Sequence, residues 1–72
     1  MLKEYNTRKE EGGNIVINLD RVEFFRPGRE RPTDYKISGV DVWLMSGAKV
    51  WIDCDYEDFI SDIELNSNKK IM

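Results

Sequence analysis

Apolar and polar residues alternate along positions 40–45 and again along positions 49–54, which is the two-residue period of a β-strand with two different faces. Ser46 and Gly47 lie between the two runs, and Gly47 suits the left-handed conformation that a tight hairpin loop needs. The pattern therefore predicts a β-hairpin. Its core face is predicted to consist of Val40, Val42, Leu44, Val50, Ile52 and Cys54.

The length of the loop decides which residues face each other across this hairpin. A two-residue loop would place Leu44 opposite a lysine. A three-residue loop, residues 46–48, would place Leu44 opposite Val50. It would also place Trp43 opposite Trp51. Because a slip of one residue moves a whole apolar set to the wrong face, we favour the three-residue loop.

The outer face of the hairpin carries two tryptophans and a methionine, Trp43, Trp51 and Met45. Aromatic cross-strand pairs stabilise a sheet. An uncovered patch of this kind also marks an interface. Two interpretations stay open: the N-terminal segment of the chain covers the patch, or another subunit or partner does.

An amphipathic helix is predicted over residues 53–66, because apolar residues recur there at helical spacing. The first turn is acidic, as the helix dipole favours, and Asp53 or Asp55 is expected to cap it. Asn66 and the two residues after it are expected to end it. The apolar stripe consists of Tyr56, Phe59, Ile60 and Ile63.

The first half of the chain adds strands at residues 14–17 and 22–26, and residues 18–21 are expected to form a turn or a single helical turn capped by Asn18. Residues 27–34 form a polar loop with two prolines. Residues 1–13 are either a first strand or a flexible arm. The chain is therefore predicted to be one α+β domain, a small meander-like antiparallel sheet of four to five strands with one C-terminal helix packed on one face.

Seventy-two residues predict a single domain with a small core. One cysteine cannot form an internal disulfide, and no long apolar run or signal-peptide pattern is present, so we expect a cytoplasmic protein. The net charge of −3 is unevenly distributed: residues 1–36 carry eight basic and seven acidic groups, and residues 37–66 carry one basic and seven acidic groups. This acidic balance argues against general nucleic-acid binding.

The absence of histidine excludes the usual Ser-His-Asp and Cys-His catalysis. Cys54 is expected to be a buried, inert thiol with no neighbouring base. Acidic residues that imitate the spacing of a calcium-binding loop are Asp53, Asp55, Glu57 and Glu64. The sixth position of such a loop needs glycine but holds Asp58, and helix capping explains these acids, so we expect no metal, no cofactor and no enzymatic activity.

One basic cluster lies on or beside the proline loop and consists of Arg26, Arg29, Arg31 and Lys36. Arginines in such a loop can bind phosphate or an acidic partner. Glu30 and Asp34 interrupt the cluster, which favours an ordinary solvated loop. If the loop binds anything, the acidic helix of a second copy is one candidate.

Three short motifs carry a family resemblance: Ile17-Asn18-Leu19-Asp20-x-Val22, Val42-x-Leu44-x-x-Gly47 and Tyr56-Glu57-Asp58-Phe59. Through them, residues 14–64 resemble the small FlbD-like flagellar-motility proteins. They are similar, more loosely, to the DNA-binding domain of LytTR response regulators. The first resemblance implies no catalytic residues. The second implies DNA binding, which conflicts with the acidic balance of the chain.

We therefore expect a non-enzymatic interaction or regulatory protein that self-associates through the face formed by Trp43, Met45 and Trp51. Its partner would be a second copy or another protein, with no membrane involved. The alternatives are a nucleic-acid-binding module that uses the arginine-rich loop, and a phage-type inhibitor whose acidic face binds a host protein.

Overall fold

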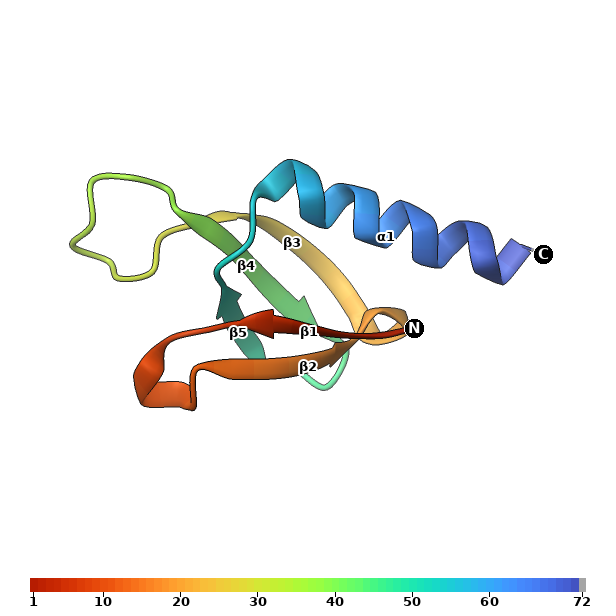
Figure 1. The fold of residues 1–72 in the computed structure, drawn as a ribbon, viewed down its shortest axis with the longest axis horizontal. Coiled ribbons are helices and arrows are strands. Elements are labelled where there is room, and N and C mark those ends of the chain that lie inside the picture. The colour runs from red at the N-terminus through yellow and green to blue at the C-terminus, as the bar shows by residue number, and fades with distance from the viewer. Residues whose placement is uncertain (72) are drawn as a thin grey trace.

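The computed structural model describes the backbone of residues 1–71 and the side chains of residues 1–68. Five antiparallel strands in two small sheets and one C-terminal helix confirm the predicted α+β fold class (Figure 1). In chain order the elements are β1 (Leu2–Asn6), the 3-10 helix η1 (Lys9–Glu11), β2 (Asn14–Asn18), the 3-10 helix η2 (Leu19–Arg21), β3 (Val22–Gly28), β4 (Gly39–Leu44), β5 (Lys49–Ile52) and α1 (Tyr56–Ile71).

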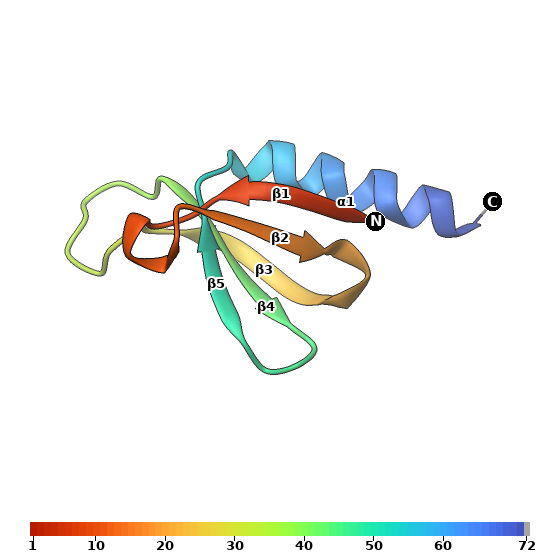
Figure 2. The ribbon, with the colours of Figure 1, turned by 60° about the horizontal axis from the view of Figure 1, so that its bottom comes forward.

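The two sheets are the β1–β2 hairpin and the three-stranded β3–β4–β5 sheet. A backbone hydrogen bond of 2.8 Å joins them, from the Asp53 N–H to the Asn6 carbonyl, and another of 2.8 Å, from the Met45 N–H to the Arg21 carbonyl, extends the β3–β4 pairing. Figure 2 shows the β1–β2 hairpin, whose strands pair from Leu2 opposite Asn18 to Asn6 opposite Asn14, beside the β3–β4–β5 sheet. The first residues are therefore a paired strand, which decides between the two interpretations of residues 1–13. The helical turn capped by Asn18 is also confirmed, because its side chain accepts from the Asp20 N–H.

The hairpin of β4 and β5 has a three-residue loop, but the predicted register is wrong by two residues. The Gly47 N–H and the Leu44 carbonyl close the turn at 2.9 Å, and Gly47 has the left-handed φ of +95° that was expected of it. The loop is therefore residues 45–47, and Val42 lies opposite Val50. Because side chains alternate with a period of two, this offset leaves the predicted core face unchanged.

Apolar residues from both sheets pack against α1 and form one core. Fully buried side chains come from the sheet at Val40, Val42 and Ile52 and from the helix at Phe59. The ring of Phe25 contacts Phe59 edge-on, with ring centroids 4.8 Å apart. Of the other predicted core residues, Val50 is buried in this cluster, and Leu44 and Cys54 are partly buried and pack against it. Tyr5, Ile17 and Leu19 complete it from the N-terminal half.

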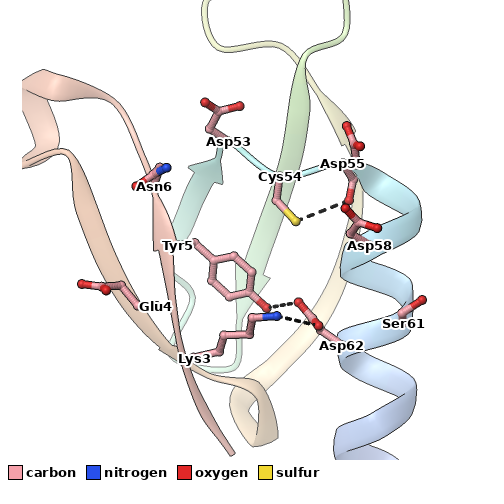
Figure 3. Close-up of a pocket in the computed structure, with 10 residues that line it drawn as sticks. All are labelled: Lys3, Glu4, Tyr5, Asn6, Asp53, Cys54, Asp55, Asp58, Ser61 and Asp62. Carbon is pink, nitrogen blue, oxygen red and sulfur yellow. Dashed lines mark hydrogen bonds and ion pairs between the residues drawn. The ribbon is translucent and has the colours of Figure 1, made fainter.

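Helix α1 is longer than predicted, because it continues past Asn66 to Ile71. Asn66 does not end the helix: it is buried, and its side-chain amide donates to Asp20 Oδ1 at 2.9 Å. One turn earlier, Asp62 accepts hydrogen bonds of 2.7 Å from Tyr5 Oη and Lys3 Nζ (Figure 3). These contacts attach the helix to β1 and η2.

The first residue of β4 is Gly39, and glycine is required there because no side chain fits at this position. An added Cβ would collide with the Ile52 carbonyl oxygen and would lie 2.7 Å from Trp51 Cζ2. We expect Gly39→Ala to lower the free energy of unfolding by about 1–3 kcal/mol, as overpacking does. Urea denaturation followed by circular dichroism measures this. Ser38→Ala, a change at the exposed neighbour, is the control, and equal stability of the two variants would contradict the close approach.

The protein is expected to lose stability in alkali because Tyr5 is buried and its hydroxyl donates a hydrogen bond to Asp62. Burial, followed by the hydrogen bond and the charge of Asp62, raises the pKa of Tyr5. The native state therefore keeps a proton that the unfolded state loses near its ordinary pKa of about 10, so stability is full below that pH and falls as the pH rises above it.

We expect Tyr5→Phe to cost about 1–3 kcal/mol at neutral pH and to flatten this alkaline decline, which unfolding measurements from pH 8 to 11 would follow. Tyr35→Phe, which changes a tyrosine that is 99 % exposed, is the control. An alkaline decline that is unchanged in Tyr5→Phe would rule out this role of Tyr5.

Candidate binding surface

The face of the β3–β4–β5 sheet that points away from α1 presents six side chains in two cross-strand rows. In the first row Phe24 lies opposite Trp43, and Trp43 lies opposite Lys49. In the second row Arg26 lies opposite Asp41, and Asp41 lies opposite Trp51. A register irregularity between Val22 and Phe24 directs Phe24 to this outer face, while the next residue, Phe25, packs on the helix.

The exposed part of this face is an aromatic stack with two cations beside its Trp43 ring. The Phe24 and Trp43 rings are stacked, with centroids 4.6 Å apart and planes at 14°. The Arg26 guanidinium lies 5.1 Å and Lys49 Nζ 5.2 Å from the Trp43 ring. Phe24 is 49 % exposed. We call Phe24, Arg26, Trp43 and Lys49 the aromatic–basic face.

A basic groove of about 340 Å³ borders the aromatic–basic face. Four cations from different parts of the chain line it: Arg8 after β1, Arg26 near the end of β3, Arg29 in the proline loop and Lys49 in β5. The one acid that lines it, Asp41, is 3.9 Å from Lys49 Nζ. Arg8 and Lys49 were not in the predicted cluster, because only the fold brings them beside the loop.

The predicted arginine loop is divided by the structure. Arg26 and Arg29 line the basic groove, whereas Arg31 forms an ion pair with Glu10. Lys36 is exposed and is not among the residues that line the groove. Half of the predicted cluster therefore contributes to one surface.

The predicted interface of Trp43, Met45 and Trp51 is not a single exposed face. Trp51 is only 3 % exposed, because the guanidinium of Arg8 covers its ring at 5.5 Å. Trp43 also lies opposite Lys49 and not opposite Trp51, as the two-residue shift requires. Met45 is 57 % exposed but belongs to the loop, beside β2. Of the two interpretations of this patch, cover by the N-terminal segment therefore holds for Trp51.

An acidic groove of about 620 Å³ separates β1 from the start of α1 (Figure 3). Asp53, Asp55, Asp58 and Asp62 line it together with Lys3. Cys54 also lines it, and burial, followed by the charges of Asp62 and Asp58, raises the pKa of this thiol. This electrostatic setting disfavours the thiolate and therefore nucleophilic chemistry.

The acids with calcium-loop spacing do not form such a loop. Glu57 and Glu64 belong to α1, whereas Asp53 and Asp55 precede it, and the Asp55 carbonyl accepts the Phe59 N–H of the first helical turn. Within the described residues no group of three or more Cys, Asp or Glu side chains is arranged to hold a metal ion. No helix in the described part of the chain is long and apolar enough to span a membrane.

Comparison of the chain with protein-family models, curated proteins and solved structures finds no match. The geometry and charge of the surfaces described above are therefore what points to a function. Of these, the aromatic–basic face combines exposed aromatic rings with cations and lies on the side of the sheet opposite the helix.

Proposed function

We propose that this chain is a non-enzymatic protein-interaction protein, and that its aromatic–basic face binds an acidic segment of a partner protein. The supporting observation is the Phe24–Trp43 stack, which stays partly exposed and has the cations of Arg26 and Lys49 beside its Trp43 ring. Aromatic residues and arginine are the residue types that dominate the energetics of protein interfaces. The stack would supply apolar contact, and the cations would supply the preference for acids.

The preference for carboxylates follows from the arginines at this surface. Within the described residues no carboxylate forms an ion pair with Arg26 or Arg29. A guanidinium can donate two parallel hydrogen bonds to one carboxylate, which makes this pairing stronger than a neutral hydrogen bond. An acidic segment would thus satisfy groups that the chain itself leaves to solvent.

Binding of single-stranded nucleic acid is the second candidate function, because bases also stack on exposed aromatic rings beside cations. The overall charge of −3 and the carboxylates of the acidic groove disfavour a long polyanion. A short acidic segment would meet fewer of these carboxylates than a long polyanion, because charges are screened over about 8 Å at physiological ionic strength.

A role without catalysis agrees with the chemistry of the chain. It has no histidine, and the raised pKa of Cys54 keeps this thiol protonated. The single cysteine also agrees with a reducing compartment, so we place the protein in the cytoplasm as part of this proposal.

A titration of the chain with a short peptide of alternating glutamate and phenylalanine, followed by tryptophan emission, tests the proposed function. We expect saturable binding. The double variant Arg26→Gln/Arg29→Gln should bind about tenfold more weakly or worse, since it removes two charge-assisted contacts. The double variant Lys9→Gln/Lys36→Gln removes the same charge outside the basic groove and should bind like the parent chain.

Equal binding by both double variants would contradict the assignment to this face. A single-stranded thymidine oligonucleotide is the matched second probe. If it binds tightly and with a steep salt dependence while the peptide does not bind, the second candidate function replaces the first.

A further inference from the structure

Strand β2 has a free edge on a part of the molecule that the proposed function does not use. It pairs with β1 along its whole length, from Asn14 opposite Asn6 to Asn18 opposite Leu2. Within the described residues, no backbone hydrogen bond joins the other side of β2 to another strand. Such an edge presents unpaired N–H and C=O groups and is a template for an additional strand.

This edge lacks the features that usually prevent strand addition. Its five residues contain no charge, no proline and no glycine. The free edge of β3 differs, because it has a register irregularity next to Glu23 and a proline at Pro27. Irregularities, charges and prolines are the devices by which proteins protect their edge strands. Of these two edges, only β2 is left open.

An apolar groove of about 440 Å³ runs beside this open edge. Its apolar lining comes from Ile15, Val16 and Ile17 of β2 and from Leu44 and Met45 where β4 ends, and Asn18, Arg21 and Ser46 complete it. Val16 is 58 % and Met45 57 % exposed. A strand added to β2 would cover these side chains, so the backbone edge and the apolar surface favour the same occupant.

The sequence of β2 is a palindrome, Asn14-Ile15-Val16-Ile17-Asn18. We infer that a second copy of this chain occupies the edge, with its β2 antiparallel to the first and a two-fold axis at Val16. In this register each Val16 lies opposite Val16 of the second copy, each Ile15 opposite an Ile17, and each Asn14 opposite an Asn18.

Self-complementarity favours a second copy over an unrelated strand. In this register apolar residues pair at the centre of the strand. Asparagine side chains pair at both ends, where each amide can donate and accept hydrogen bonds. No pair of like charges meets in this register. A two-fold pairing also covers both free edges at once and closes the assembly as a dimer.

Sedimentation velocity of the full chain over a range of concentrations tests this inference. The 8.5 kDa chain should form a dimer. Val16→Lys should raise the dimer dissociation constant by about tenfold or more, because two lysines would face each other and the apolar contact would be lost. Val16→Glu should act in the same way. Val16→Thr, which keeps a β-branched residue without charge, is the control and should stay close to the parent chain.

Mixing the two charged variants gives the sharpest result. If Val16 lies on the two-fold axis, a lysine of one copy meets a glutamate of the other, and the mixture should associate at least about tenfold more tightly than either variant alone. A parent chain that is monomeric at all concentrations would overturn the inference. So would charged variants that dimerise like the parent chain, or a mixture that does not recover.

The outcome is independent of the proposed function. The aromatic–basic face includes no residue of β2, so Val16→Lys should bind the acidic peptide as the parent chain does. Loss of the dimer with peptide binding retained supports the inference. A dimer without peptide binding would contradict only the proposed function.

Discussion

The burial of Trp51 is the constraint on which the arrangement of the chain depends. Its indole Nε1 donates to the Gly28 carbonyl at 3.3 Å, and its own carbonyl accepts a 2.6 Å hydrogen bond from Thr7 Oγ1. Arg8 covers the ring, and the start of β4 approaches it so closely that only glycine fits at position 39. One side chain therefore connects the end of β3, the start of β4, β5 and the segment after β1. Because the core of this domain is small, the contacts of Trp51 contribute much of the packing that holds the two sheets in place.

This junction also determines which surfaces remain available. Because the N-terminal segment covers Trp51, the aromatic rings left open on the outer face of the sheet are those of Phe24 and Trp43, with Arg26 and Lys49 beside Trp43. The same segment brings Arg8 into the basic groove. The carboxylates gather instead between β1 and α1. Folding therefore separates the charges of the chain into a basic groove and an acidic groove, although the net charge is small.

Much of the fold could be predicted from local patterns. The alternation of apolar residues located β4 and β5 and their core face, Gly47 located the turn, and Asn18 located the short helix η2. These features depend on neighbours in sequence. The hairpin register was wrong by two residues because both alignments bury the same face, so hydrophobic pattern does not distinguish them.

The remaining errors come from contacts that are distant in sequence. The cover of Trp51 depends on Arg8, which is 43 positions away, and the helix continues past Asn66 because this residue donates to Asp20, 46 positions away. The aromatic–basic face was missed for a similar reason: Phe24 and Lys49 join Trp43 only once the three strands are aligned. The adjacent pair Phe24-Phe25 was the available signal, since a strand must direct one of the two outward.

Acrylamide quenching of two single-tryptophan variants measures whether Trp51 is buried. Trp43→Phe leaves Trp51 as the only tryptophan, and Trp51→Phe leaves Trp43. If Arg8 and the neighbouring backbone bury Trp51, the Trp43→Phe protein should emit at shorter wavelength and resist quenching, while the emission of Trp43 in the Trp51→Phe protein is quenched readily. Equal quenching in two folded variants, or a more accessible Trp51, would contradict the account.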